Sequence, residues 1–227
     1  MKSILTTLLL IFGIGRVAVD APFSDLPLHL TEPKGDVRGI VVLWSGDGGW
    51  SRTLQSFADA LAERGYGVVG INSLRYFWYE QAPETMARDT DLIVAHFTDY
   101  WHSDRVILGG YSFGADTLPL AWPLMNEQTR AQTVLLALLS PFQRTEFKIT
   151  FLGMLGIVHG DHDVSAAIDA LPASHVLCLT GEGESDMACR QTAPYRVVTV
   201  PGGHRYDGNA ALIAETLDQA ADQNRLP

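Results

Sequence analysis

Basic residues are scarce in this chain of 227 residues, and their scarcity excludes a large class of proteins. Lysine and arginine together number 16, against 26 aspartates and glutamates, so the formal net charge is −10. Nucleic-acid binding requires a basic surface to neutralise phosphates, and we therefore expect no nucleic-acid partner. The same imbalance disfavours adsorption to anionic lipid and favours a small cationic substrate.

Motifs for metals and cofactors are also missing from the sequence. No cysteine–histidine cluster has the spacing of a zinc site. The glycines at 46, 48 and 49 fit neither the phosphate-binding loop nor the dinucleotide fingerprint. We therefore predict that the protein uses no metal and no cofactor.

The first 21 residues have the composition of a signal peptide. Lys2 precedes an apolar run over 4–14, Arg16 ends the run, and small residues flank Asp20 at the positions that a signal peptidase reads. The run is too short for a comfortable membrane span, and no later stretch is long and apolar enough for one. We predict cleavage after Ala21, with an uncleaved anchor as the alternative.

Cysteine is rare, because the chain holds only Cys178 and Cys189. If the chain is exported, these two thiols can form a disulfide. The loop closed would be short, and the bond would contribute about 3 kcal/mol to stability in the chain-entropy model. Two free thiols would be the expectation for a protein that stays in the cytosol.

Beyond residue 21, apolar runs of strand length alternate with amphipathic segments of helical period. This rhythm predicts a mostly parallel sheet covered by helices on both faces, in a single domain over 22–227. The segment 147–154 is open between a strand and part of a cap. The predicted strands are 39–44, 67–71, 105–109, 133–139, 176–180 and 196–200, and the main helices begin at Ser51, Pro83, Phe113, Val164 and Asn209.

The strongest chemical signal is Gly-Tyr-Ser-Phe-Gly at 110–114, between a predicted strand and a predicted helix. Small residues flank the serine of such a turn because its backbone is strained and its neighbours approach closely. The turn would expose the hydroxyl of Ser112 at the carboxyl edge of the sheet. The amide of Phe113, at the helix start, would then stabilise an anionic intermediate. We therefore predict an α/β-hydrolase fold with Ser112 as nucleophile.

A glycine-rich loop, Ser-Gly-Asp-Gly-Gly-Trp at 45–50, follows the first buried strand. Acyl transfer requires a second backbone donor for the oxyanion, and in this fold such a loop supplies it. The amide of Asp47 is the candidate donor, and Trp50 is a candidate wall of the pocket. A plain tight turn is the alternative interpretation.

The candidate base is His204, which follows Gly-Gly directly after the last predicted strand. A chain order of serine, acid and histidine is typical of α/β-hydrolases. The acid should follow the strand at 176–180, where residues 181–186 supply three carboxylates. Asp186 is the first choice and Glu184 the second, with Asp161 and Asp163 as the fallback.

Other residues are candidates for the substrate pocket. Asp116 lies one helical turn beyond the nucleophile and would face either a cationic group or solvent. Arg75 and Tyr76 either line the pocket or pack a surface loop. Tyr111, next to the nucleophile, is the remaining candidate for substrate contact.

Three segments together resemble the bacterial VirJ family, which includes the carboxyl-terminal domain of AcvB. The resemblance spans about residues 36 to 222, and Ser112 and His204 fall on matching motif positions. The stretch over 178–189 also resembles the family but does not decide between Glu184 and Asp186. The three segments are Ser-Gly-Asp-Gly-Gly-Trp at 45–50, Ser-Leu-Arg-Tyr-Phe-Trp at 73–78 and Gly-Tyr-Ser-Phe-Gly-Ala-Asp-Thr-Leu-Pro at 110–119.

The resemblance implies a periplasmic serine hydrolase that cleaves the aminoacyl ester of lysyl-phosphatidylglycerol. The implied partners are the aminoacylated headgroup, the periphery of the membrane and periplasmic proteins of type IV secretion and virulence. Two alternatives stay open: a general carboxylesterase or lipase of the same fold, and a periplasmic scaffold that uses the fold without catalysis.

Overall fold

The computed structural model describes residues 23–150 and 160–224. The predicted signal peptide therefore lies outside the described residues, as does the second half of the segment 147–154. Among the described residues, no helix combines the length and the apolar character needed to cross a bilayer.

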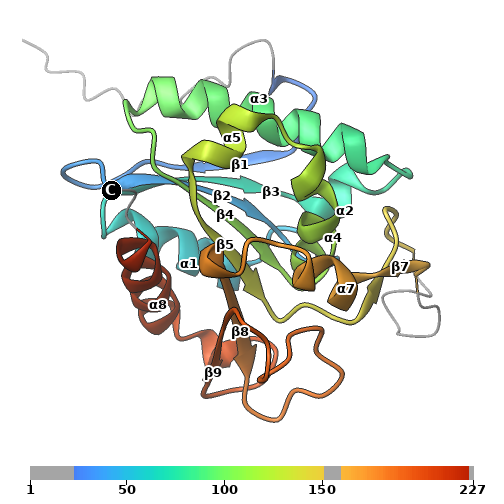
Figure 1. Ribbon diagram of the computed structural model, residues 1–227. Coiled ribbons are helices and arrows are strands. Elements are labelled where there is room, and N and C mark those ends of the chain that lie inside the picture. The colour runs from blue at the N-terminus through green and yellow to red at the C-terminus, as the bar shows by residue number, and fades with distance from the viewer. Residues whose placement is uncertain (1–22, 151–159, 225–227) are drawn as a thin grey trace, which may run out of the picture.

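The core of the described structure is a seven-stranded sheet with the order β1-β3-β2-β4-β5-β8-β9. All neighbouring strands run parallel except β1, which pairs antiparallel with β3 at one edge. The long strands from the middle of the chain form the centre of Figure 1. The bounds are Leu28–Thr31 for β1, Gly39–Trp44 for β2, Tyr66–Ile71 for β3, Val106–Tyr111 for β4, Thr133–Leu139 for β5, Val176–Gly181 for β8 and Arg196–Val200 for β9.

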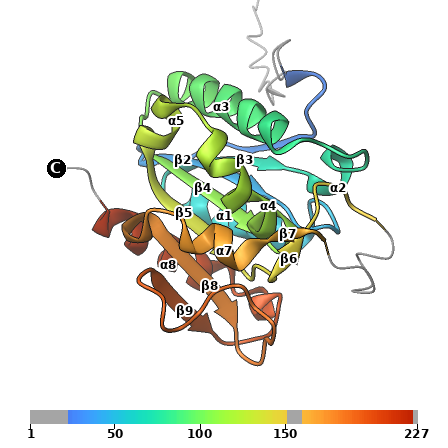
Figure 2. The same cartoon turned by 45° about the vertical axis from the view of Figure 1, so that its right-hand side comes forward.

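Helices cover both faces of this sheet. Helices α1 (Arg52–Ala62) and α8 (Ala210–Gln223) pack against each other on one face. The opposite face carries α3 (Pro83–Tyr100), with α4 and α5 beside it (Figures 1 and 2). The remaining short elements are α2 (Ser73–Tyr76), α4 (Phe113–Ala121), α5 (Glu127–Gln132), α7 (Val164–Asp169) and the two-residue strands β6 (Arg144–Thr145) and β7 (His162–Asp163).

The continuous apolar runs form strands because both faces of the central sheet are buried. Every residue of β2, β3, β5 and β8 is buried, as expected for parallel strands between two helical layers. Helix α1 begins where predicted, with the Ser51 side chain accepting a hydrogen bond from Leu54 N–H. The mostly parallel sheet with helices on both faces is confirmed.

Five short elements, β1, α2, α5, β6 and β7, were not predicted from the sequence. Strand β1 is only half-buried along its length, so its four residues give no strong apolar signal. Helices α2 and α5 have four and six residues, too few for a helical period to appear. Strands β6 and β7 pair over two residues each.

The carboxyl ends of β2, β4, β5, β8 and β9 lie at the same edge of the sheet because these strands are parallel. Five segments leave these strand ends: the loop at 45–50, the turn at Ser112, the turn at Ser140, the loop at 181–186 and the segment 201–205 that carries His204. Ligand sites of open α/β sheets lie outside the carboxyl ends of the strands. The candidate residues therefore gather there.

Candidate active site

Ser112 occupies a strained turn between β4 and α4. Its backbone has φ 52° and ψ −121°, a conformation that residues other than glycine rarely adopt. Its N–H donates to the Leu139 carbonyl at 2.8 Å, which fastens the turn to the end of β5. Ser112 is 6% exposed at the N-cap of α4, so it lies next to the amides at the helix start.

Glycine is required on either side of this turn because neighbouring backbone segments lie too close to leave room for a Cβ atom. A Cβ at Gly110 would meet the backbone of Gly114, because the helix folds directly back over the strand. A Cβ at Gly114 would meet the carbonyl oxygens of Trp44 and Ser45 at the end of β2. The spacing of the motif thus reflects three backbone segments packed without side chains between them.

The glycine-rich loop after β2 lies against the nucleophile. A Cβ built on Gly46 would be 3.3 Å from the Ser112 Cβ. The loop is a tight turn closed by Gly49 N–H donating to the Gly46 carbonyl at 3.0 Å. Asp47 follows Gly46 in this turn, while Phe113 follows Ser112 on the other side. The two residues predicted to form the oxyanion hole therefore come from segments that flank the serine.

The carboxylate that contacts His204 belongs to Glu184. Its Oε1 lies 2.6 Å from His204 Nδ1, and its side chain is 7% exposed against 35% for the histidine. Asp186, the first choice from the sequence, is exposed and has a positive φ of 62°, and its carboxylate contacts the neighbouring Ser185. The structure thus corrects the first choice in favour of Glu184.

Further donors hold the Glu184 carboxylate in place. Its Oε2 accepts hydrogen bonds from Ser140 Oγ at 2.6 Å and from Gly181 N–H at 2.5 Å. Burial raises the pKa of Glu184, but the bonds from His204, Ser140 and Gly181 outweigh burial and leave the pKa below its usual range. Glu184 is therefore ionised at neutral pH and oriented at both oxygens.

His204 is tied to the strand that carries the nucleophile. Tyr111 donates its hydroxyl to the His204 carbonyl at 2.8 Å, and the two rings have centroids 5.2 Å apart. On another side, the Phe142 ring lies 5.4 Å from the imidazole. Since Tyr111 precedes Ser112 directly, the histidine and the serine lie at the same edge of the sheet.

Asp116 is buried one turn beyond the nucleophile. It is 4% exposed, and its Oδ1 accepts a hydrogen bond from Phe142 N–H at 2.6 Å. Burial raises the pKa of Asp116 well above its usual value, the Phe142 bond lowers it, and the nearby charge of Asp47 raises it further. Among the described residues, no cation contributes to this balance, so the carboxyl lacks a counter-ion.

The family described as "Bacterial virulence protein (VirJ)" matches residues 38–225 of the chain. The protein belongs to the VirJ family. The resemblance seen in the three sequence motifs is therefore confirmed over almost all of the described residues. No curated protein matches the chain in sequence.

Solved structures similar to this VirJ-family protein are α/β-hydrolases in architecture. Est1E from Butyrivibrio proteoclasticus is 14% identical, with a TM-score of 0.58, over 87% of this chain and 93% of that one. XC6422 from Xanthomonas campestris, described as an α/β serine hydrolase without lid, is 17% identical, with a TM-score of 0.58, over 88% and 91%. A dienelactone hydrolase described as putative, from Klebsiella pneumoniae, is 14% identical, with a TM-score of 0.57, over 87% and 93%. At these identities the likeness establishes the α/β-hydrolase fold.

Several residues expected in the pocket have packing roles in this VirJ-family protein. Trp50 stacks on His29, covers Gly70 of β3 and donates its indole N–H to Gln55. Tyr76 is 8% exposed, and its hydroxyl donates to Asp89 of α3 at 2.7 Å. The structure corrects both expectations, because these side chains are committed to the sheet edge and to α3.

Tyr111 and Arg75 also differ from the expected substrate contacts. The Tyr111 hydroxyl is occupied by the His204 carbonyl, and burial raises the pKa of Tyr111 to about 12. Arg75 is exposed on α2, where its charge lowers the pKa of His29 after the larger effect of burial. Tyr111 therefore positions the histidine loop of this VirJ-family protein.

The predicted disulfide between Cys178 and Cys189 is confirmed, with Cα atoms 6.2 Å apart. It joins β8 to the far end of the loop that carries Glu184. The fallback acid Asp163 instead accepts a hydrogen bond from Ala166 N–H and caps α7. Within the described ranges, no three histidine, cysteine, aspartate or glutamate side chains are grouped to hold a metal ion.

Sequence reasoning missed three residues around the acid and the histidine. Ser140 contacts Glu184, Phe142 contacts the His204 ring, and Tyr206 contacts Ser140. Ser140 follows β5 with a positive φ of 52°, and Tyr206 is fully buried two residues after the histidine. The sequence signal was the Ser-Pro at 140–141, which marked the end of a strand. These contacts form because the chain segments that follow β5, β8 and β9 meet in space, which local patterns do not report.

Proposed function

We propose that this VirJ-family protein is a serine hydrolase that cleaves esters, with Ser112, His204 and Glu184 as its triad. The observation that carries the proposal is the strained Ser112 turn at the same sheet edge as His204, whose Nδ1 is held by a buried carboxylate at 2.6 Å. Strained backbone at a strand–helix turn is costly and is retained where it presents a reacting group.

The proposed reaction has two steps. His204 Nε2 takes the proton of Ser112 as the hydroxyl oxygen attacks the ester carbonyl, and the amides of Phe113 and Asp47 stabilise the oxyanion. His204 then protonates the departing alcohol, which leaves an acyl-enzyme. Water, deprotonated by His204, attacks the acyl-enzyme; His204 then returns this proton to the Ser112 oxygen, which releases the acid and free Ser112.

Glu184 has an orienting and electrostatic role in this mechanism. By accepting from Nδ1–H it fixes the tautomer in which Nε2 is free to act as a base. Its negative charge stabilises the imidazolium that forms when the serine is deprotonated. Because the pKa of Glu184 lies below its usual range, the charge is present throughout the neutral range.

The substrate we propose is the lysyl ester of phosphatidylglycerol, which the VirJ family resemblance implies. A lysyl ester carries two ammonium groups at neutral pH, and the chain has a net charge of −10. Asp116 and Asp47 place two carboxyl groups beside the nucleophile, with no cation acting on Asp116 within the described part of the chain. A buried carboxyl without a counter-ion gains most from a charged ligand that pairs with it.

We place the protein in the periplasm and at the periphery of the membrane, where the proposed lipid is accessible. Two features support an exported location: the predicted signal peptide over 1–21 and the Cys178–Cys189 disulfide. We expect no nucleic-acid partner, and periplasmic secretion proteins remain proposed partners through the family resemblance.

The test compares wild type with Ser112→Ala on lysyl-phosphatidylglycerol vesicles, with released lysine and remaining lipid measured by chromatography. We expect lysine release by wild type and none by the variant. A fluorophosphonate probe should label the wild type at Ser112 only. Absence of both labelling and ester cleavage in folded wild type would sink the hydrolase proposal.

A second candidate function is a general carboxylesterase of the same fold. The names of the structural neighbours, an esterase from Rhodothermus marinus and a dienelactone hydrolase among them, favour ester cleavage without specifying a cationic acyl group. A panel of lysyl, alanyl and fatty-acyl esters separates the two functions. A scaffold without catalysis would instead retain its biological effect in Ser112→Ala.

A further inference from the structure

Two serines at neighbouring strand ends have the same unusual backbone. Ser112 follows β4 and Ser140 follows β5, and each has a φ of 52°. Each donates its N–H to a carbonyl near the end of the next strand in the sheet, Ser112 to Leu139 at 2.8 Å and Ser140 to Leu179 at 2.7 Å. The Ser112 turn presents the proposed nucleophile, and the Ser140 turn likewise holds a hydroxyl in a fixed place.

The Ser140 hydroxyl faces inward and contacts two functional groups. Ser140 is completely buried, and its Oγ donates to Glu184 Oε2 at 2.6 Å. The same Oγ lies 2.6 Å from the Tyr206 hydroxyl. Since the single Ser140 proton goes to Glu184, the contact with Tyr206 requires Tyr206 to donate to Ser140.

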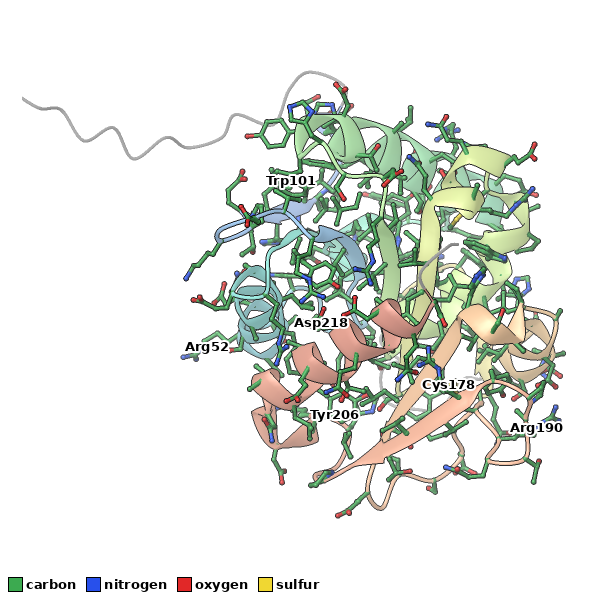
Figure 3. The ribbon with its side chains drawn as sticks, turned by 60° about the vertical axis from the view of Figure 1, so that its left-hand side comes forward. Arg52, Trp101, Cys178, Arg190, Tyr206 and Asp218 are labelled. Atoms are coloured by element: carbon green, nitrogen blue, oxygen red, sulfur yellow. A yellow bond between two sulfur atoms is a disulfide. The ribbon has the colours of Figure 1, made fainter. Side chains whose placement is uncertain are left out.

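Tyr206 is held for this contact by its own surroundings. It lies where the chain passes from β9 to α8, and it is fully buried (Figure 3). Its φ of 53° is again positive. Its hydroxyl also donates to the Leu179 carbonyl at 3.1 Å, so its one proton is shared between that carbonyl and the closer Ser140 Oγ. Burial raises the pKa of Tyr206 well above its usual value, so the hydroxyl keeps its proton.

We propose that Ser140 and Tyr206 are positioning residues that form a hydroxyl relay onto Glu184 and thereby keep its carboxylate ionised and oriented toward His204. The proposal rests on the hydrolase function proposed above and deepens it. The hydrogen bonds run in one direction, from Tyr206 to Ser140 to Glu184, and His204 Nδ1–H donates to the other carboxylate oxygen. Hydrogen bonds aligned in one direction polarise one another, so the relay would favour the ionised and correctly rotated Glu184.

Removing the relay should have a defined effect on the pH dependence of activity. Without the Ser140 bond, Glu184 loses a donor to its charged form and its pKa rises. A protonated Glu184 can no longer accept from Nδ1–H, so it fails to hold His204 as a base. The acid limb of the kcat profile therefore moves toward higher pH, whereas a loss of folded protein lowers activity equally at every pH.

The test uses Ser140→Gly and Tyr206→Phe in the full-length protein. Glycine adopts a positive φ without strain, so Ser140→Gly removes the hydroxyl and relieves the backbone at the same time. Tyr206→Phe removes only the second hydroxyl of the relay. Thr180→Val is the matched control, because the Thr180 hydroxyl pairs with Thr199 on the adjacent strand and contacts neither Glu184 nor His204.

We expect kcat on a lysyl ester to fall about tenfold in Ser140→Gly and by a smaller factor in Tyr206→Phe, with KM nearly unchanged. The acid limb should move to higher pH in both variants. The double variant should be no slower than Ser140→Gly, since Tyr206 acts through Ser140. Thermal melts should show Ser140→Gly and the control to be folded at the assay temperature.

Two results distinguish failure of the relay from failure of the hydrolase function. The first result is a wild type that fluorophosphonate labels at Ser112, together with variants that keep the wild-type rate and an unmoved acid limb. This result would overturn the relay alone. Rates that fall uniformly across pH in proportion to folded protein would also overturn it. A wild type that neither reacts with the probe nor cleaves esters would remove the hydrolase function itself.

Discussion

Glu184 and Asp186 are two residues apart in one loop, but only Glu184 has a buried carboxylate. Glu184 accepts from His204, Ser140 and Gly181, while Asp186 is exposed. The two side chains therefore provide a matched pair for testing the triad. Substitution by the corresponding amide keeps the size of each side chain and removes its charge.

We expect Glu184→Gln to lower kcat by on the order of a thousandfold, because an amide disrupts the tautomer and cannot stabilise the imidazolium. Asp186→Asn should keep wild-type kcat. Steady-state kinetics on a soluble ester at neutral pH measures both. Equal losses in the two variants, or a larger loss in Asp186→Asn, would contradict the assignment of the acid.

Asp116 allows a prediction about pH as well as specificity. The pKa of Asp116 is raised in the folded protein, whereas in the unfolded chain it is about 4. As the pH rises above about 4, the unfolded chain releases this proton first, so the carboxyl lowers the stability of the folded state. Asp116→Asn retains an oxygen to accept from Phe142 N–H and carries no charge. The variant should melt at a higher temperature than wild type at pH 7, and this difference should shrink toward pH 4.

The same substitution tests the proposed cationic substrate. If Asp116 pairs with a lysyl ammonium, Asp116→Asn should lower kcat/KM for a lysyl ester about tenfold and leave a neutral acyl ester within about twofold. Competing the two esters in one assay gives the ratio directly. Equal effects on both esters would restrict Asp116 to its structural bond with Phe142.

At the scale of elements, the unit formed by β2, β4 and α4 depends on glycine at 114. A Cβ at Gly114 would collide with the carbonyls of Trp44 and Ser45, which are backbone and have little room to move. We expect Gly114→Ala to destabilise the fold by at least about 2 kcal/mol and to abolish activity. Gly48→Ala is the control, because nothing lies within 4 Å of a Cβ at Gly48. Chemical denaturation of both variants measures the difference in the free energy of unfolding.

The long elements were predictable because each carries a complete local signal. Strand β5 was predicted with its observed bounds, Thr133–Leu139, since a continuous apolar run between polar residues indicates a buried parallel strand. Helix α3 begins at Pro83, as a proline in the first turn indicates. Strand β1 escaped prediction because its pairing with β3 stabilises a short, half-buried segment that has little apolar character of its own.

At the scale of the whole molecule, the disulfide joins a central strand to the loop that carries the acid. Cys178 lies in β8 within the buried core, and Cys189 follows Glu184 by five residues. On the other side of the loop, Ala188 N–H donates to the Pro141 carbonyl at 2.8 Å, next to Ser140. The disulfide therefore stabilises the fold and restrains the loop whose Glu184 contacts His204.

Loss of the disulfide should destabilise the protein by about 3 kcal/mol, a large part of the stability of a typical domain. The paired variant Cys178→Ala/Cys189→Ala should unfold at lower denaturant concentration and show lower kcat. Wild type treated with reductant should match the variant, while the reductant should not affect the variant further. An undiminished kcat in a folded variant would show that the loop holds Glu184 without the disulfide.

The sequence by itself determined the layered parallel sheet and the family, and it singled out Ser112 and His204 as the candidate nucleophile and base. These follow from local information: apolar runs, a glycine-flanked serine between strand and helix, and a histidine after the last strand. Only the tertiary structure decided the acid and its support. No local sequence pattern separates the three carboxylates that lie within residues 181–186. Glu184 is distinguished only by its buried contact with Ser140, which follows a different strand. The packing of Trp50 and Tyr76 was decided in the same way, because a side chain's role depends on what the fold places opposite it.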